Sequence, residues 1–239
     1  MSKTPIVEKL NKPETNVRTI AILGGTGALG GGLARRWSRA GYNVIIGSRN
    51  TEKAQTAANE LNAAFPDVDV SGKENSSAAE NADIVVLTVP FKHQIDTLTV
   101  VKNALSGKIL IDVTVPLVPP KVGTVQMPDE GSAGLKAQSF LGDDVSVVSA
   151  FQNVSASHLN DDHIVECDVL VTGNKKAARA EVIELVQAAG LKGWHAGPLT
   201  NSIATEALTS LLISINRHHK VDGAGIVITG GHLDNVNQD

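Results

Sequence analysis

Three glycines at the start of the first helical pattern have the type and spacing that most directly indicate a chemical task. Gly25, Gly27 and Gly30 form the pattern G-x-G-x-x-G within the stretch GGTGALG. The pattern alone is a weak signal, because glycines mark any tight turn, but here a buried apolar run leads in and a helix leads out. In that setting the first glycine permits the turn, the second lets the backbone approach a pyrophosphate, and the third lets the helix pack on the strand. The N–H groups at the helix start would hold the phosphates, which predicts a dinucleotide-binding site.

The end of the next strand indicates which dinucleotide binds. An acidic residue usually lies there and bonds the ribose hydroxyls of NAD. The stretch NVIIGSRN (43–50) carries Ser48 and Arg49 instead. Arginine can grip a 2′-phosphate with two parallel hydrogen bonds, Ser48 and Thr26 can donate to it, and Lys53 one helical turn further adds a positive charge. The alternative is that Arg49 and Lys53 form an ordinary solvated face, but the absence of an acidic residue favours NADP.

A further group of candidates follows the apolar run ADIVVLTVP (82–90), the strongest strand pattern in the sequence. The carboxyl ends of strands line the ligand crevice in doubly wound folds. Thr88, Val89, Pro90 and His93 are therefore candidates to contact the ribose and nicotinamide side of the cofactor. Two roles stay open for His93, a contact to the ligand or a surface cap of the next helix.

Other reactive residue types give no comparable pattern. His158, His163, His218 and His219 lack metal-type spacing with other ligands, so we predict no metal site. Cys167 is the single cysteine, so no intrachain disulfide can form, which suits a reducing cytosol. We expect Cys167 to be a buried core residue rather than a thiol activated by His163.

Composition limits the class of protein. Of 239 residues, 42% are hydrophobic and 19% charged, as in an ordinary globular protein, and the net charge is −4. This balance gives no electrostatic reason to expect nucleic acid or an anionic membrane as a partner. No apolar run approaches the roughly 20 residues that span a bilayer, and the N-terminus lacks the apolar core of a secretory signal. We therefore expect a cytoplasmic protein whose ligands are small molecules.

Strand and helix patterns alternate along the chain. Strands are expected over 18–23, 43–47, 68–72, 82–90, 108–114, 146–151 and 168–173. Helices are expected over 27–41, 50–65, 91–107, 175–190 and 198–219, and a long Pro- and Gly-rich loop over 115–134. This order predicts an α/β fold, a doubly wound (Rossmann) parallel sheet with helices on both faces.

The same pattern suggests a division of the chain. Residues 1–17 are expected to be a flexible arm, and residues 18–150 an NADP-binding Rossmann domain. Residues 151–230 would form a small α/β extension that widens the sheet and ends in the long helix, and residues 231–239 would be a tail. The helix over 198–219 is apolar on more than one face, which is typical of a helix buried against a partner.

No acid–base pair suggests itself for the reaction. Short-chain dehydrogenases need a Tyr–Lys pair at four-residue spacing, but Ile46 stands four residues after Tyr42, the single tyrosine. Hydroxyacid and imine dehydrogenases usually need a larger helical second domain than the residues after 150 allow. If the acceptor is itself a hydride carrier, the protein needs only to stack two rings, and positioning supplies most of the catalysis. We therefore predict no catalytic side chain.

Several longer stretches resemble one family, the NADPH-dependent reductases of the deazaflavin coenzyme F-420. They are IAILGGTGALGGGLARRWSRAGYNVIIGSRN, ADIVVLTVPFKHQIDTL, VPLVP and AGPLTNSIATEALTSLLISINRHHKVDGAGI, and the resemblance runs from about residue 18 to 229. It implies direct hydride transfer between nicotinamide C4 and deazaflavin C5. It also implies a homodimer or larger oligomer with the C-terminal helix at the interface. It places NADP on Thr26, Gly27, Ala28, Leu29, Ser48, Arg49, Lys53, Val89 and His93.

The resemblance is less complete on the acceptor side. Archaeal members of the family carry histidine in the segment matching SAFQNVSA (149–156), near the deazaflavin, whereas this chain has Gln152 there, with Val154 and Ala156 nearby. Gln152, Ala156 and Ala224 complete the set of candidate cofactor-binding positions. Two other functions stay open. One is an NADPH-dependent reductase of ferric iron or a flavin, and the other is a non-catalytic redox sensor that binds NADP.

Overall fold

The computed structural model describes residues 17–161 and 164–230 of the chain. Its strands are β1 (Thr19–Leu23), β2 (Asn43–Ser48), β3 (Val70–Glu74), β4 (Ile84–Leu87), β5 (Ile109–Asp112), β6 (Ser146–Ser149), β7 (Asp168–Gly173) and β8 (Lys192–His195). Its helices are α1 (Ala28–Arg39), α2 (Thr51–Ala64), α3 (Asn75–Glu80), α4 (Gln94–Val101), α5 (Ala133–Leu141), α6 (Ala156–Leu159), α7 (Lys176–Ala188) and α8 (Ser202–His219). Short 3-10 helices are η1 (Phe91–His93), η2 (Lys102–Leu105) and η3 (Leu199–Asn201).

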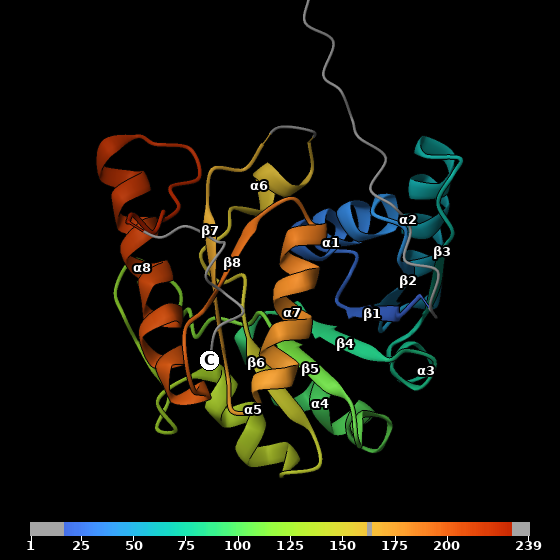
Figure 1. Ribbon diagram of the computed structural model, residues 1–239, viewed down its shortest axis with the longest axis horizontal. Coiled ribbons are helices and arrows are strands. Elements are labelled where there is room, and N and C mark those ends of the chain that lie inside the picture. Colours follow the sequence, from blue (N-terminus) through green and yellow to red (C-terminus); the bar gives the residue numbers. More distant parts are fainter. Residues whose placement is uncertain (1–16, 162–163, 231–239) are drawn as a thin grey trace, which may run out of the picture.

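Within the described residues the strands form one sheet in the order β3-β2-β1-β4-β5-β6-β7-β8, with helices on both faces (Figure 1). The order β3-β2-β1-β4-β5 confirms the doubly wound Rossmann fold. The last strands widen the sheet and α8 follows them, as expected. The expected tail over 231–239, His163 and all but the last residue of the expected arm over 1–17 lie outside the described residues.

The strand β7 corrects the expectation of a fully parallel sheet. Strands β1 to β6 pair in parallel, but β7 runs antiparallel to β6, with Val148 opposite Gly173, and β8 is again parallel to β7. A parallel strand needs a connection that crosses to the other end of the sheet, usually by a long helix. Among its described residues, the link between β6 and β7 contains one helix, the four-residue α6, which packs against α1. Because this link does not cross back, β7 starts near the edge where β6 ends.

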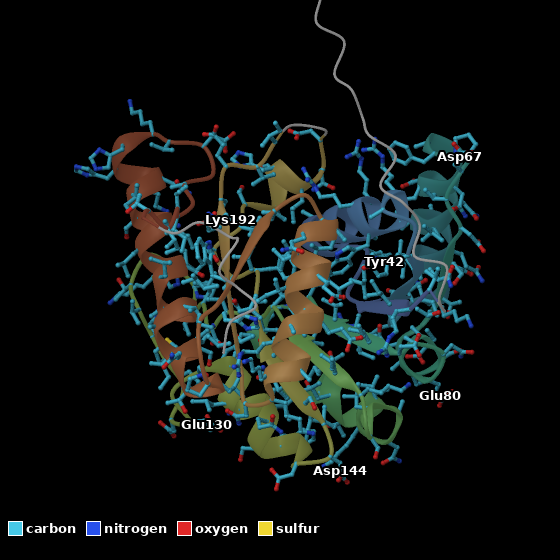
Figure 2. The ribbon with its side chains drawn as sticks, viewed as in Figure 1. Tyr42, Asp67, Glu80, Glu130, Asp144 and Lys192 are labelled. Atoms are coloured by element: carbon cyan, nitrogen blue, oxygen red, sulfur yellow. The ribbon has the colours of Figure 1, made fainter. Side chains whose placement is uncertain are left out.

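Alternating residues of β1 fill two separate cores. Ile20 and Ile22 lie in the core that also contains Leu33 and Trp37 of α1, whereas Ala21 lies in the opposite core against α3, α4 and α5. The indole nitrogen of Trp37 donates to the carbonyl oxygen of Leu185 at 2.8 Å, which joins α1 to α7. The acidic side chains of Asp67, Glu80, Glu130 and Asp144, by contrast, lie at the periphery of the molecule (Figure 2). None of the helices in the described residues combines the length and apolar character that crossing a bilayer requires.

Four elements were absent from the expected pattern. They are α3, α5, α6 and β8, and each is short or poor in apolar residues. The predicted loop over 115–134 is largely correct, because α5 begins only at Ala133. The loop runs along α8, where the Ser214 hydroxyl donates to the carbonyl oxygen of Gly123 at 2.8 Å. This contact with the C-terminal helix holds the long loop in place.

Helix α8 is attached to the rest of the fold by a buried carboxylate. Glu206 accepts hydrogen bonds from the backbone N–H groups of Ala133 at 2.6 Å and Gly134 at 3.0 Å, which are the first residues of α5. These N–H groups have no acceptor within their own helix. The hydroxyl of Ser132, the N-cap of α5, lies 2.6 Å from that of Ser202 on α8. The N-terminus of α5 is therefore capped by residues that follow it far along the chain.

The segment after α8 is bound to the start of β7. The N–H of Asp168 donates to the carbonyl oxygen of Ile226 at 2.8 Å, and the Asp168 carboxylate accepts from the N–H of Ile228 at 2.7 Å. The same carboxylate oxygen accepts from the Trp194 indole at 2.7 Å. Nearby, Cys167 is buried, as expected for a core residue, and the amide of Asn153 lies 3.2 Å from its sulfur.

Candidate functional site

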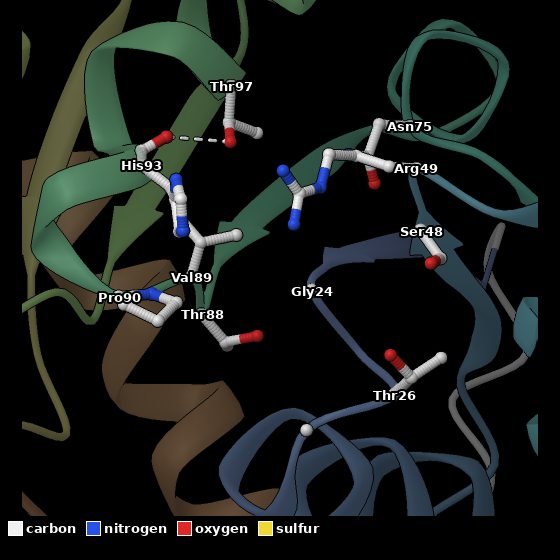
Figure 3. Close-up of a pocket in the computed structure, with 11 residues that line it drawn as sticks. Gly24, Thr26, Ser48, Arg49, Asn75, Thr88, Val89, Pro90, His93 and Thr97 are labelled. Carbon is white, nitrogen blue, oxygen red and sulfur yellow. Dashed lines mark hydrogen bonds between the residues drawn. The ribbon is translucent and has the colours of Figure 1, made fainter.

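An open cleft of about 230 Å³ lies at the carboxyl ends of β1, β2 and β4 (Figure 3). In a doubly wound sheet this is the edge at which ligands bind. Eight of the residues predicted from the sequence line the cleft together: Thr26, Gly27, Ser48, Arg49, Thr88, Val89, Pro90 and His93. Gly24, Asn75 and Thr97 line it as well, although the sequence patterns did not single them out.

The three glycines of the turn differ in how much space the fold leaves for a side chain. A Cβ on Gly25 would lie 2.8 Å from the carbonyl oxygen of Ile22, and one on Gly30 would lie 2.7 Å from the Cα of Gly25. Neither position has room for a side chain. A Cβ on Gly27 would meet only the carbonyl oxygen of Gly24, at an ordinary 3.4 Å. The fold therefore has room for a methyl group at Gly27, so packing within the protein does not account for the glycine there, and its contact to a ligand stays a prediction.

The start of α1 has the properties of an anion site. Its N-cap is Gly27, which has no side chain to accept from the first N–H groups, and no acidic residue lies in the first turn. Ala28, Leu29 and Gly30 occupy that turn, where backbone N–H groups lack acceptors within the helix. The helix dipole adds partial positive charge at the same end. A phosphate or pyrophosphate at this point would accept these hydrogen bonds.

The wall formed by the end of β2 presents hydrogen-bond donors. Ser48 is buried, and its hydroxyl oxygen accepts from the N–H of Asn50 at 3.2 Å, so its own proton remains available to donate. The exposed Arg49 extends its guanidinium across the cleft (Figure 3). Lys53 lies on the first turn of α2, exposed, and is not among the residues that line the cleft. Thr26, Ser48 and Arg49 thus lie together, whereas Lys53 stands further out.

An acidic residue beside this wall is turned away from it. Glu74 lies opposite Ser48 in the pairing of β3 with β2. Its carboxylate caps α3 by accepting from the backbone N–H of Ser76 at 2.7 Å and from the Ser76 hydroxyl. Burial acts to raise the pKa of Glu74, but the hydrogen bonds from Ser76 outweigh it and hold this pKa below its ordinary value. The negative charge is therefore held in a cap rather than directed at the ligand.

The opposite wall is formed by the residues after β4. The hydroxyl of Thr88 donates to the carbonyl oxygen of Leu23 at 3.0 Å, which ties β4 to the end of β1. His93 follows in η1, and its carbonyl oxygen accepts from the Thr97 hydroxyl at 2.8 Å. The His93 side chain makes no capping hydrogen bond to α4 and instead lines the cleft. His93 is thus the N-cap residue of α4 without a side-chain capping bond, its ring lies across the cleft from Arg49, and its contact to a ligand stays a prediction.

Buried polar residues fix this wall from beneath. Gln94, fully buried, donates from its amide to the Asp112 carboxylate at 2.6 Å and to the Thr114 hydroxyl at 3.0 Å. Burial raises the pKa of Asp112 to about 6, against the lowering effect of hydrogen bonds from Thr114 and Gln94. Burial, and then the charge of Asp112, raises the pKa of Glu206 to about 8. The two buried carboxyl groups therefore do not both need to be ionised at neutral pH.

The other eight predicted positions are not among the residues that line the cleft: Gly25, Ala28, Leu29, Gly30, Lys53, Gln152, Ala156 and Ala224. The Gln152 amide is buried and donates to the carbonyl oxygen of Asp112 at 2.8 Å and to the Ser149 hydroxyl at 2.7 Å, so it serves the interior of the protein. Ala156 begins α6, and the N–H of Ala224 donates to the Asn216 side chain at 2.8 Å. These last three belong to the residues after 150, and a contact of theirs to a ligand stays a prediction.

The residues that sequence reasoning missed had weak signals. Asn75 directly follows β3, so the rule that strand ends line the crevice could have found it, but β3 was the weakest strand pattern. Thr97 lies one helical turn after His93. Within the part of the chain that the structure describes, no three His, Cys, Asp or Glu side chains gather as a metal ion would need.

The difference in space for a side chain between Gly30 and Gly27 can be tested by mutation. We expect Gly30→Ala to lower the free energy of unfolding by about 1–3 kcal/mol, because its Cβ has no room. We expect Gly27→Ala to change it by less than about 1 kcal/mol, since the fold accommodates the methyl group, yet to weaken NADP binding at least about tenfold by holding the pyrophosphate off the backbone. Urea unfolding and calorimetric titration measure the two effects. Equal NADP affinity in Gly27→Ala and wild type would contradict this assignment.

Comparison with known proteins agrees with this geometry. Residues 19–116 match the family described as NADP oxidoreductase, coenzyme F420-dependent. The F420-dependent NADP reductase of Methanocaldococcus jannaschii is 40% identical over 88% of this chain and 97% of its own length, and that of Methanothermobacter marburgensis is 43% identical with the same coverage. A crystal structure of a provisionally assigned F420-dependent NADP reductase from Arthrobacter sp. FB24 superposes with a TM-score of 0.74 at 27% identity, covering 88% of this chain and 98% of that one.

Proposed function

Because the chain belongs to the family of F420-dependent NADP reductases, we propose that it transfers a hydride between NADP(H) and the deazaflavin coenzyme F-420. The observation that carries the proposal is the cleft in which Ser48 and Arg49 face an uncapped, glycine-rich helix start, in a chain that matches such reductases over nearly their whole length. NADPH, when bound, supplies the hydride and F-420 accepts it, or the reverse.

The residues of the cleft fit NADP. The N–H groups at the start of α1 would hold the pyrophosphate, with Gly27 leaving the backbone open to it. Arg49, Ser48 and Thr26 would hold the 2′-phosphate of the adenosine, with Lys53 adding charge from outside the cleft. His93 faces Arg49 across the same cleft, so it would border the adenosine rather than the nicotinamide. A contact of Thr88, Val89 and Pro90 to the ribose and nicotinamide side stays a prediction.

No acid–base residue is required of this chain. Both partners in the reaction carry the hydride themselves, so the protein contributes by orienting two rings and excluding water between them. The buried carboxylates Asp112 and Glu206 are not among the residues that line the cleft, and both are engaged in structural hydrogen bonds. Their part in the reaction is to hold α4 and α5 in place beneath the site.

We propose in addition that two copies of the chain associate through α8. Ile203, Leu211 and Ile215 are 38%, 49% and 42% exposed and lie at four- and eight-residue spacing, along one side of the helix. An exposed apolar stripe of this kind is typical of an interaction surface. A cytoplasmic location is proposed as well, since the single cysteine is buried and unpaired.

Reaction with the two candidate acceptors tests the proposed function. Purified protein is mixed with NADPH and oxidised F-420, and loss of the deazaflavin's visible absorption is followed, with free FMN as a parallel acceptor. We expect rapid bleaching of F-420 and none of FMN. Tight NADPH binding with no turnover of F-420 would contradict the proposal and favour another acceptor or a sensing role.

Replacing Arg49 tests the assignment of the 2′-phosphate. We expect Arg49→Ala to raise the Michaelis constant for NADPH about 10- to 100-fold, because it loses a charged hydrogen-bonding partner. The constant for NADH should change little, since NADH has no phosphate at that position. Arg18→Ala, at the opposite end of β1, is the matched control and should alter neither constant. Equal effects of Arg49→Ala on the two cofactors would rule out this role.

Light scattering tests the proposed dimer. We expect wild-type protein to have twice the mass of one 25.0 kDa chain. Leu211→Lys should shift it toward the monomer, because it places a charge in an apolar contact. Val100→Lys makes the same kind of change at an apolar residue on α4 that is 60% exposed, and should leave the mass unchanged. A wild-type protein with the mass of one chain would refute the association.

A further inference from the structure

One buried side chain in the cleft has a hydrogen-bonding atom that the protein leaves unsatisfied. Asn75 is only 4% exposed and lines the cleft beside Ser48 and Arg49. Among the described residues, nothing hydrogen bonds to its amide oxygen. An unsatisfied buried acceptor costs about 1–3 kcal/mol, so each one calls for an explanation, and at the edge of a cleft a ligand is one.

Folding does not account for the amide of Asn75. It is the first residue of α3, but the cap of that helix is the Glu74 carboxylate, which accepts from the N–H of Ser76. The neighbouring strand instead leaves space for it, because a Cβ on Gly47 would lie 3.0 Å from the Asn75 oxygen. The end of β2 thus accommodates an amide that none of the described residues satisfies, which points to a ligand as its partner.

The position of Asn75 identifies the part of the ligand it would meet. Because Ser48 pairs with Glu74 across β2 and β3, the next residue, Asn75, lies beside the wall to which we assign the 2′-phosphate. In Figure 3 its amide oxygen points to the region between Arg49 and Ser48. The phosphate carries acceptors, which cannot satisfy an amide oxygen. The adjoining base of the same nucleoside does carry a donor, the N6 amino group of adenine.

We propose that Asn75 recognises the adenine base of the dinucleotide, its amide oxygen accepting from the N6 amino group and its amide nitrogen donating to a neighbouring ring nitrogen. An asparagine amide matches this donor–acceptor edge of adenine with two hydrogen bonds. The amide oxygen is buried beside Gly47 in this structure, and a turn about the Cβ–Cγ bond, a soft torsion in asparagine, would bring it to the cleft. The inference rests on the NADP site of the proposed function, but not on the identity of the hydride acceptor.

The rest of the cleft suits a flat base at this place. Val89 and the His93 ring form the wall opposite Asn75 and Arg49 (Figure 3). A guanidinium stacks readily on a planar ring, so Arg49 can cover the base while its nitrogen atoms reach the phosphate. Asn75 would then read the edge of the base while the two walls hold its faces.

Deamino-NADP, in which a carbonyl oxygen replaces the N6 amino group, is the probe that tests this role. Calorimetric titration compares its affinity with that of NADP, with no F-420 present. We expect wild-type protein to prefer NADP about 10- to 100-fold, the discrimination of one paired amide at a base edge. We expect Asn75→Leu to bind the two ligands within about twofold of each other, since leucine offers neither donor nor acceptor.

Stability separates recognition from a structural role. Because the Asn75 oxygen is unsatisfied in the free protein, Asn75→Leu should match or exceed wild type in urea unfolding. Asn59→Leu, the same change at an exposed position on α2, is the control and should keep the preference for NADP. Asn75→Ala is the second variant, should leucine prevent folding, and should likewise lose the preference.

The possible results distinguish this inference from the proposed function. A wild-type protein that binds NADP and deamino-NADP equally, or an Asn75 variant that keeps the preference, overturns the role of Asn75 and leaves the NADP site standing. A wild-type protein that binds neither ligand overturns the NADP site and this inference with it. A preference for NADP that is lost in the variants supports Asn75, even if F-420 is not reduced.

Discussion

The contact between Gly25 and Gly30 is the constraint on which the site depends. A Cβ on Gly30 would lie 2.7 Å from both the Cα of Gly25 and the hydroxyl of Thr88, so the start of α1 is pressed against the ends of β1 and β4 at once. This close packing brings the N–H groups of the helix to the edge of the sheet where β2 delivers Ser48 and Arg49. The cleft thus depends on the close approach of α1 to the end of β1, which is possible because both Gly30 and Gly25 lack a side chain.

A second set of contacts makes the C-terminal residues part of the same structure. The Glu206 carboxylate caps α5, and the Gln94–Asp112 pair holds the start of α4, which carries His93 into the cleft. Gln152, whose amide bonds to the backbone of Asp112, connects β5 with the residues after β6. The sheet is continuous from β3 to β8, so the binding sites for the hydride acceptor and for NADP would be supported by one sheet.

The sequence alone predicts those features that depend on residues close together in the chain. The strand–turn–helix at residues 19–39 and the Ser48–Arg49 pair at the end of β2 follow from local pattern. The direction of β7 could not be predicted, because it depends on α6 packing against α1 rather than on the strand's own residues. The hydrogen bond from the Gln152 amide to a strand 40 positions earlier in the chain could not be predicted either, and its contact to a ligand stays a prediction. Asn75 directly follows β3, and it was missed because that strand has the weakest pattern in the sequence.

The capping of α5 by α8 has a consequence for how the protein is made. Ala133 and its partner Glu206 are separated by 73 positions in the chain. At a synthesis rate of about 5–20 residues per second, the start of α5 leaves the ribosome roughly 4–15 seconds before its capping carboxylate. Segment 224–228, which binds Asp168, arrives later still. The nascent chain therefore holds α5 with only its own Ser132 cap until Glu206 is made, and the start of β7 gains its contacts with segment 224–228 only after α8 is complete.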